Sequence, residues 1–166
     1  MIIVEGMDNT GKTTLIEQLS KALRIPNART GTYPREIRDI SHWSNWAAAC
    51  PWPLILDRHP AISDLVYGPI IRGSTCSAPQ LAQAARRNNF LIYCCPSMSE
   101  VERTYSSREQ LKGTHENLRA LYQEYDSLMT QLSPDFYYDY TNPHHYDALI
   151  NQLARFIHKG PLHEDA

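Results

Sequence analysis

The chain begins Met1-Ile-Ile-Val-Glu-Gly-Met-Asp-Asn-Thr-Gly-Lys-Thr-Thr14, a short apolar run followed by glycines, a lysine and threonines. Its segment Gly6–Thr13 matches the pattern G-x-x-x-x-G-K-S/T, in which backbone N–H groups wrap a phosphate and the lysine reaches the phosphate oxygens. Leu15, Leu19 and Leu23 then recur at every fourth position, which predicts an amphipathic helix. A strand, a glycine-rich loop and a helix therefore follow one another as a phosphate-binding loop requires, and the stretch indicates a nucleoside-triphosphate site.

Length and charge limit the class of protein. The chain has 166 residues, enough for one domain with a substantial core, and its formal net charge of -2 provides no broad basic surface. It has no apolar run long enough for a membrane span or a signal peptide, and its cysteines show no C-x-x-C spacing. These features predict a cytoplasmic protein that binds neither a nucleic acid polymer nor a membrane. We expect one domain over residues 1–160 and a frayed tail at 161–166.

Short apolar runs alternate with segments of helical period, which is typical of a parallel sheet covered by helices. The expected strands are Ile2–Glu5, Ala28–Tyr33, Pro53–Asp57, Phe90–Cys94 and Phe136–Tyr140. A long apolar stripe predicts a helix over Leu118–Leu132, and Asn142 followed by Pro143 predicts the start of the last helix. The sequence thus predicts an α/β fold, a P-loop NTPase three-layer sandwich with a five-stranded parallel sheet, helices on both faces and the first strand in the centre.

The phosphate loop, Gly6–Thr13, needs further charged groups to act on ATP. Lys12 would reach the β- and γ-phosphates, and the Thr13 hydroxyl would ligate Mg²⁺. Asp57 and Arg58 stand at the carboxyl end of the third expected strand, at the edge where open α/β sheets bind ligands. Asp57 would hold Mg²⁺ directly or through water, and Arg58 would clamp a phosphate; an ion pair at the strand end is the structural alternative. The expected ATP-binding residues are Gly6, Asn9, Thr10, Gly11, Lys12, Thr13 and Thr14.

Two segments resemble the thymidylate kinase family. Val4–Thr14 is similar to its phosphate loop, E-G-x-D-x-x-G-K-S/T-T, and Asp57-Arg-His with Ser63 and Tyr67 resembles its D-R-Y/H…S…Y segment, although Ser63 stands one residue further on. The resemblance implies a small deoxynucleoside monophosphate kinase of viral or phage type, which transfers the γ-phosphoryl group of Mg-ATP to a dTMP-like acceptor. It also implies that Asp8 contacts the sugar hydroxyl of the acceptor. Members of the family commonly form homodimers, so the resemblance allows a homodimer here. Ser63 and Tyr67 lie four apart and would line the base pocket.

The region after the second expected strand supplies further groups for the acceptor. Thr32–Arg35 resembles the F-P-x-R type segment of eukaryotic members, whose arginine grips the acceptor phosphate. Arg35, or Arg38 on the same helix face, would take that role, and the base would stack on Trp43 or Trp46. The expected acceptor-binding residues are Asp8, Tyr33, Arg35, Arg38, Trp43, Trp46, Arg58, Ser63 and Tyr67.

A lid over ATP is the remaining element of the resemblance. Glu102–Arg108 resembles the family's lid, which we expect near residues 103–113. The phosphate loop has no arginine, and in such members lid arginines supply the catalytic charge. Arg103 or Arg108 would therefore join Lys12, Asp57 and Arg58 as catalytic residues; a solvated helix face is the structural alternative.

Two other functions compete with this one. The segment Asp57–Ser63 also resembles the D-R-H-P segment of herpesvirus thymidine kinases, which phosphorylate the nucleoside itself. Such enzymes need a carboxylate base near the end of the second strand, where this chain offers only Glu36. A P-loop switch or regulatory ATPase is the third candidate, and it would need a segment that the γ-phosphate orders.

Overall fold

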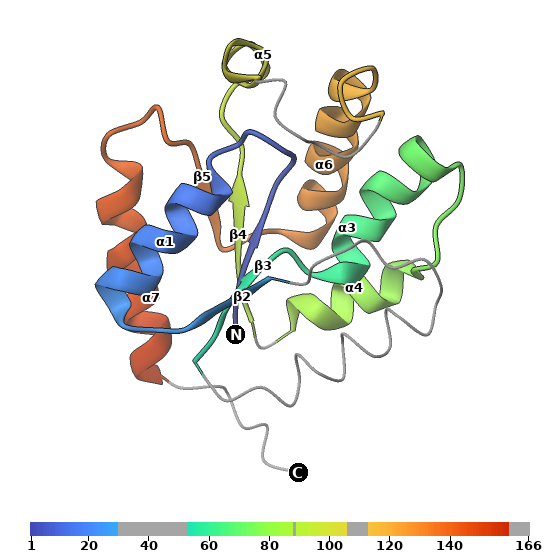
Figure 1. Cartoon of the computed structure of the whole chain (residues 1–166). Coiled ribbons are helices and arrows are strands. Elements are labelled where there is room, and N and C mark those ends of the chain that lie inside the picture. Colours follow the sequence, from blue (N-terminus) through green and yellow to red (C-terminus); the bar gives the residue numbers. More distant parts are fainter. Residues whose placement is uncertain (30–52, 88, 106–112, 160–166) are drawn as a thin grey trace.

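The computed structural model of the protein describes residues 1–29, 53–87, 89–105 and 113–159, to which all structural statements below refer. Its strands are β1 (Ile2–Glu5), β2 (Asn27–Arg29), β3 (Ile55–Asp57), β4 (Phe90–Cys94) and β5 (Phe136–Tyr138). Its helices are α1 (Lys12–Leu23), α3 (Pro60–Tyr67), α4 (Pro79–Arg86), α5 (Met98–Thr104), α6 (Leu118–Leu132) and α7 (His145–Lys159), and a short π-helical segment, η1 (Gly68–Arg72), follows α3. The strands lie in the middle of the molecule with helices on either side (Figure 1).

β1 is the central strand of one parallel sheet. The strand order is β2-β3-β1-β4-β5, and each neighbouring pair runs parallel. Every residue of β1 is buried, as expected for a strand that is covered on both faces and paired on both edges. The structure confirms the predicted fold class, an α/β three-layer sandwich around a five-stranded parallel sheet, and the central position of the first strand.

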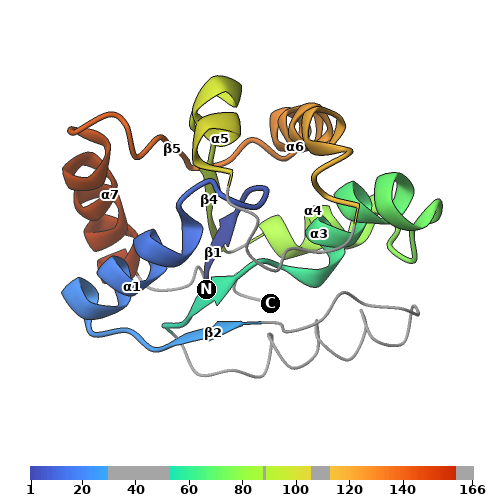
Figure 2. The same cartoon turned by 45° about the horizontal axis from the view of Figure 1, so that its top comes forward.

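Helices cover both faces of the sheet (Figure 2). Because successive side chains of a strand point to opposite faces, β1 contributes to two separate cores. Ile2 and Val4 pack in a core with α1 and α7, whereas Ile3 packs in a core with α3, α4 and α6. Leu15 and Leu19 of the predicted stripe in α1 are buried in the first core. The sheet is therefore held between two apolar layers, which fixes its carboxyl edge in place.

Two strands on one side of β1 differ from the predicted boundaries. β3 begins at Ile55 and not at Pro53, because proline has no N–H to donate to a ladder. Ile55 N–H donates to the Pro26 carbonyl at 3.0 Å, which starts the pairing with β2. β2 begins at Asn27, one residue before the predicted start, and the rest of its predicted range, 30–33, lies outside the described residues.

The turn between β5 and α7 was also predicted at the wrong positions. β5 ends at Tyr138, because the Asp139 carboxylate accepts the Thr141 N–H at 2.9 Å and turns the chain. The helix begins at His145 and not at the predicted Asn142-Pro143 start. The side-chain oxygen of Asn142 accepts the N–H of residue 144 at 3.0 Å, so it closes a turn before the helix instead of capping it.

Residues 60–72 form two successive helical elements. α3 ends at Tyr67 and continues as η1, since Pro69 cannot donate an N–H within a regular α-helix. Asp64 of α3 is fully buried, and its carboxylate pairs with the Arg72 guanidinium of η1. The same carboxylate accepts hydrogen bonds from the Thr75 hydroxyl and from the N–H groups of Cys76 and Ser77, each at 2.7 Å. This buried anion ties the loop after η1 back to α3.

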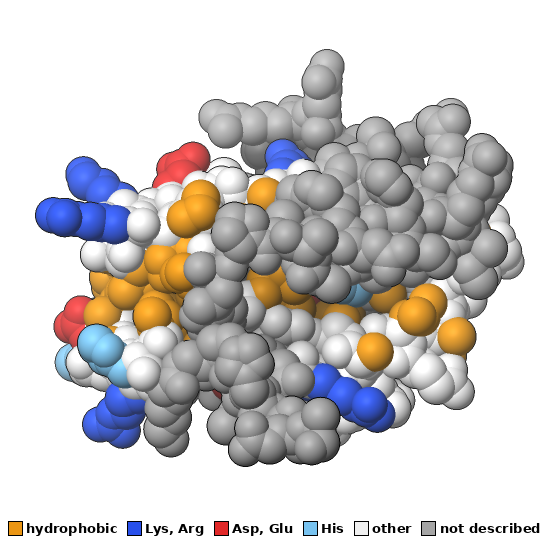
Figure 3. Space-filling model, turned by 90° about the horizontal axis from the view of Figure 1, so that it is seen from below, with side chains coloured by type: hydrophobic (Ala, Val, Ile, Leu, Met, Phe, Trp, Pro, Cys, Tyr) orange, Lys and Arg blue, Asp and Glu red, His pale blue; other side chains and the backbone are white. Residues whose placement is uncertain are grey.

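The end at the bottom of Figure 1 is seen directly in Figure 3, where basic and acidic side chains of the described residues lie toward the margin and hydrophobic side chains lie between them. The loop between β1 and α1 lies at the opposite end, at the carboxyl edge of the sheet (Figure 1). Among the described residues, none of the helices combines the length and the apolar character needed to cross a membrane.

Candidate functional site

The phosphate loop joins the end of β1 to the start of α1, and its glycines are required by close contacts. Gly6 has φ +141°, and a Cβ there would lie 2.6 Å from the carbonyl oxygen of Cys94 in β4. Gly11 precedes α1 in a left-handed conformation, with φ 81°. No acidic residue stands in the first turn of α1, so the positive end of the helix is left for an anion.

Lys12, the first residue of α1, is held inside the loop. Its side chain is buried, and its ammonium group donates to the Met7 carbonyl at 2.5 Å. The Thr10 hydroxyl donates to the same carbonyl at 2.8 Å. Burial, followed by repulsion from Arg58, lowers the pKa of Lys12 to about 8. An anion in the loop would give this ammonium a stronger partner than a neutral carbonyl oxygen.

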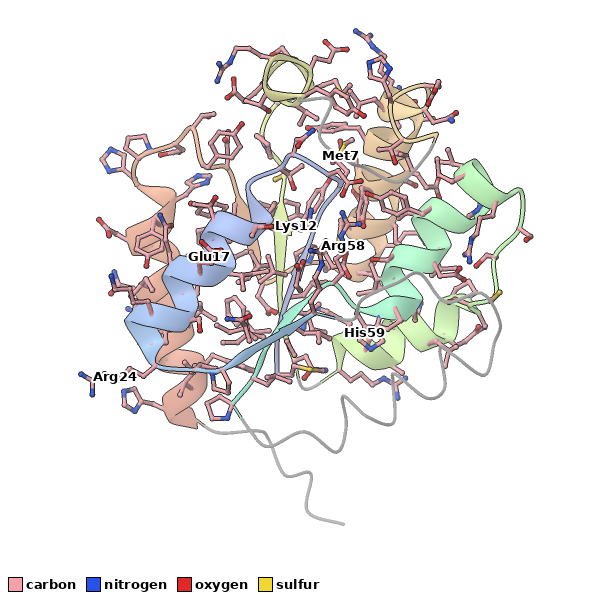
Figure 4. The ribbon with its side chains drawn as sticks, viewed as in Figure 1. Met7, Lys12, Glu17, Arg24, Arg58 and His59 are labelled. Atoms are coloured by element: carbon pink, nitrogen blue, oxygen red, sulfur yellow. The ribbon has the colours of Figure 1, made fainter. Side chains whose placement is uncertain are left out.

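A cavity of about 340 Å³ opens beside the loop. Its walls come from the loop, the first turn of α1 and the ends of β2 and β3. The lining residues are Asp8, Asn9, Gly11, Lys12, Thr13, Thr14, Arg29, Asp57 and Arg58. Lys12 and Arg58 both lie at this end of the sheet, whereas Glu17 and Arg24 are exposed elsewhere on α1 and beyond it (Figure 4). The tertiary structure therefore brings five of the predicted ATP-binding residues, from Asn9 to Thr14, to one cavity with Asp8, Asp57 and Arg58.

Arg58 and Asp8 form an ion pair at the cavity. The Arg58 guanidinium nitrogen Nη2 lies 2.6 Å from Asp8 Oδ1, and the two side chains are 11% and 25% exposed. The Tyr67 hydroxyl donates to the other Asp8 oxygen at 3.2 Å. The Arg58 guanidinium carbon also lies 5.0 Å from the centre of the Tyr67 ring. These contacts hold Arg58, the predicted phosphate clamp, against Asp8, the predicted sugar contact. Tyr67, predicted to line the base pocket, contacts both side chains.

Asp57 and Thr13 share the wall of the same cavity. The Asp57 side chain is 12% exposed, and its Oδ2 lies 3.5 Å from Nε of Arg29, whose side chain is 75% exposed. Such an exposed and long pair contributes little to stability, so it leaves the Asp57 carboxylate able to exchange its partner. The sequence did not single out Arg29, although its position at the end of β2 could have indicated a second cation at the sheet edge.

Glu5 and Tyr125 were missed by the sequence interpretation. Glu5, the last residue of β1, is fully buried, and its carboxylate accepts the His59 N–H at 2.5 Å and the Tyr125 hydroxyl at 3.3 Å. Burial raises the pKa of Glu5 to about 7, against the opposing effects of Arg58 and Lys12. An acidic residue directly after an apolar strand was the available signal for Glu5. Tyr125 carried none, because it forms part of an ordinary apolar stripe in α6.

Two other predicted residues lie apart from the cavity. Ser63 of α3 is 4% exposed, and its hydroxyl has no hydrogen-bond partner within the described part of the chain. Arg103 of α5 is 71% exposed and forms an ion pair with Glu100 at 2.6 Å, so the structure does not bring it to the phosphate loop. Glu100 also accepts the Tyr140 hydroxyl at 2.9 Å, and the Tyr140 ring packs against Gly11.

Several predicted residues lie outside the described ranges. They include most of the predicted lid, 103–113, and the tail at 161–166. The site residues concerned are Tyr33, Arg35, Arg38, Trp43, Trp46 and Arg108. Their roles remain predictions from the sequence.

Comparison with known proteins gives a similarity in structure but no match of the chain to a family model or to a curated sequence. A solved structure does match it: the YorR protein of Bacillus subtilis in complex with phosphorylated GDP. The two chains share 18% sequence identity with a TM-score of 0.75, over 95% of this chain and 97% of the other. The similarity establishes a common fold across almost the whole length.

The packing of Tyr140 on Gly11 leads to a prediction about stability. A Cβ at Gly11 would lie 2.8 Å from Cδ1 of the Tyr140 ring, whereas a Cβ at Gly73, which has φ +73°, would meet no atom within 4 Å. Gly73→Ala should cost about 1 to 2 kcal/mol of unfolding free energy through its left-handed backbone alone. Gly11→Ala should cost about 1 kcal/mol more, because the ring must move. Urea unfolding of both variants measures the difference, and equal losses would contradict the packing.

Proposed function

We propose that the protein is a deoxynucleoside monophosphate kinase, which transfers the γ-phosphoryl group of ATP to a dTMP-like acceptor and yields ADP and a deoxynucleoside diphosphate. The observation that carries the proposal is the presence of Lys12, Arg58 and Asp8 on the wall of one cavity. The loop and its lysine suit the phosphates of ATP. The paired arginine and aspartate suit a second ligand that has both a phosphate and a sugar hydroxyl.

The fold supports this proposal without naming the substrate. The YorR structure, which shares the fold, contains phosphorylated GDP. A nucleotide ligand for the present chain is in keeping with that neighbour and with the loop pattern Gly6–Thr13. The resemblance of the loop and of the Asp57-Arg-His segment to thymidylate kinases supplies the acceptor class.

The proposed chemistry relies on positioning and on neutralisation of charge. An oxygen of the acceptor phosphate attacks the γ-phosphorus of ATP in line, and the bond from that phosphorus to the bridging oxygen breaks, so its electron pair leaves with ADP. Lys12 and the first turn of α1 neutralise the donor phosphates, and Arg58 neutralises the acceptor phosphate. A phosphate monoester is already ionised near neutral pH, so the acceptor needs no general base.

Mg²⁺ fits the cavity as part of the proposal. Thr13 and Asp57, whose side chains could offer oxygen ligands, both line the cavity. Within the described residues there is no group of three or more His, Cys, Asp or Glu side chains that could form a cage around a metal. Mg²⁺ commonly takes one or two protein oxygens and obtains the rest from phosphates and water, so Thr13 and Asp57 would be enough on the protein side. The ion would neutralise charge on the phosphates that Lys12 contacts.

The ion pair between Arg58 and Asp8 suggests how an acceptor would bind at the site. In the structure, Arg58 and Asp8 satisfy each other. An acceptor offers a phosphate to the arginine and a hydroxyl group to the aspartate, so both side chains would exchange one partner for another. Arg103 would act on ATP only after it leaves Glu100. Arg108 is the other proposed lid arginine.

The experiment that tests the function is a panel of acceptors at a single ATP concentration, with ADP release as the readout. The proposal expects ADP release that depends on an added deoxynucleoside monophosphate. Release with nucleosides but not with monophosphates would favour a nucleoside kinase. Equal ATP consumption with and without an acceptor would favour a switch or regulatory ATPase. Deoxy- and ribonucleoside monophosphates of each base complete the panel and report the sugar and base preference.

Lys12→Ala should lower kcat at least a hundredfold, which corresponds to about 3 kcal/mol of lost transition-state stabilisation. The reason is that its ammonium group is the cation inside the loop. Lys21→Ala is the control, because Lys21 is exposed in the last turn of the same helix. Steady-state kinetics with the best acceptor measure both variants, and a near-normal kcat for Lys12→Ala would refute the role of the loop.

Asp8→Ala should raise the KM of the acceptor far more than the KM of ATP. The aspartate lies beside Arg58 and is the proposed partner of the acceptor sugar. Asp8→Asn keeps one carbonyl oxygen at that position, so its effect on the acceptor KM should be smaller. Initial rates with each substrate varied in turn give both constants. A defect in the KM of ATP alone would instead assign Asp8 to the metal.

A further inference from the structure

A chain of buried hydrogen bonds leads from the end of β1 to the side chain of Arg58. Arg58 Nη1 donates to the Tyr125 hydroxyl oxygen at 3.1 Å, and that hydroxyl donates to Glu5 Oε2 at 3.3 Å. The other Glu5 oxygen accepts the His59 N–H at 2.5 Å. Glu5 and Tyr125 are each 0% exposed and do not line the cavity. Arg58 is therefore connected to two buried residues that a ligand in the cavity does not touch.

We propose that Glu5 and Tyr125 are positioning residues, which hold the Arg58 guanidinium in the orientation that a phosphate needs. That this phosphate belongs to a monophosphate acceptor rests on the function proposed above. That Glu5 and Tyr125 orient the Arg58 guanidinium does not depend on that function.

The direction of the hydrogen bonds supports this role. A guanidinium group only donates, so the Tyr125 oxygen must be the acceptor in its contact with Arg58. The hydroxyl hydrogen is then directed to Glu5, which in its ionised form only accepts. With Glu5 ionised, the hydrogen bonds run in one direction, from Arg58 through Tyr125 to Glu5. The charge of ionised Glu5 strengthens the bonds of this chain.

Glu5 also holds the backbone next to Arg58. Arg58 has φ 69°, an uncommon conformation for a residue other than glycine. Its own N–H donates to the Val4 carbonyl at 3.0 Å, and the next N–H, of His59, donates to Glu5. Glu5 thus holds the backbone just after Arg58 directly and the Arg58 side chain through Tyr125.

The ring of Tyr125 is fixed by its aromatic neighbours. It stacks on Tyr93 with ring centres 6.2 Å apart and meets Tyr67 edge to face at 5.9 Å. The Tyr93 hydroxyl donates instead to Asp126 at 2.6 Å. A ring held in this way cannot swing its hydroxyl away from Arg58 without disturbing the core.

The hydrogen-bonded relay from Glu5 through Tyr125 to Arg58 matters most when a ligand is bound. Asp8 also holds Arg58, but Asp8 lies on the cavity wall and is the proposed partner of the acceptor sugar. Once Asp8 turns to that sugar, Tyr125 and Glu5 still hold the guanidinium from behind. The exchange at Asp8 then proceeds without loss of the Arg58 orientation.

Kinetics of Tyr125→Phe test the relay. The variant should lower kcat/KM for the acceptor about tenfold, the effect of one lost hydrogen bond to a charged group, and leave the KM of ATP within about twofold. Tyr93→Phe is the matched control, because it removes a partly buried hydroxyl from the same aromatic stack but not from the relay. Glu5→Gln should resemble Tyr125→Phe. Equal kinetic effects of Tyr125→Phe and Tyr93→Phe would overturn the proposal.

A second measurement needs no substrate and so separates this inference from the proposed function. In ¹⁵N-arginine-labelled protein, the guanidinium signal of Arg58, assigned with Arg58→Lys, reports rotation of the group. Rotation should be about tenfold faster in Tyr125→Phe or Glu5→Gln than in the wild type or Tyr93→Phe. Unchanged rotation in both relay variants would overturn the relay. If no monophosphate is a substrate, the proposed function fails and the rotation rates still decide the relay.

Discussion

The parallel pairing of β1 with β3 is the constraint on which the rest of the site depends. It sets Val4 opposite Asp57, so the phosphate loop and Arg58 leave the sheet at the same edge. The N–H of Arg58 continues the pairing one step beyond β3 by donating to the Val4 carbonyl. Parallel strands end together, and their connections cross the faces of the sheet, which leaves this edge open for ligands. Lys12 and Arg58 are therefore neighbours in space although they are far apart in the sequence.

This geometry crowds charges into a place with little water. Separate buried charges would be costly, so each one has a partner: the Met7 carbonyl for Lys12, Asp8 for Arg58, and the Tyr125 and His59 donors for Glu5. Met7 and Asp8 lie in the loop, where an anion can replace them as partners of Lys12 and Arg58. The partners of Glu5 lie inside the core, where an anion cannot replace them, and one of them, Tyr125, also holds Arg58. The site therefore combines contacts of Met7 and Asp8 that a ligand can replace with contacts of Glu5 that stay in place.

Much of the fold could be predicted because it depends on periodicity, and the boundaries could not, because they depend on single hydrogen bonds. The burial of β1 and the stripe of α6 follow from apolar spacing. Asn142-Pro143 reads as a helix start, yet the Asn142 side chain closes a turn first. Arg103 pairs with Glu100, three residues earlier, in the structure, and its contact with ATP stays a prediction.

By itself, the sequence determined the loop pattern Gly6–Thr13, the succession of the five strands along the chain, and the charged pair Asp57-Arg58 at the end of β3. These features depend on residues close together in the chain, and short patterns are enough to specify them. Only the tertiary structure decided that the Glu5 charge is buried, that Asp8 meets Arg58, and that Tyr125 joins Arg58 to Glu5. The Asp8–Arg58 pair joins the loop after β1 to the turn after β3, and the contacts of Tyr125 add α6, so these contacts exist only once segments far apart in the sequence have packed together.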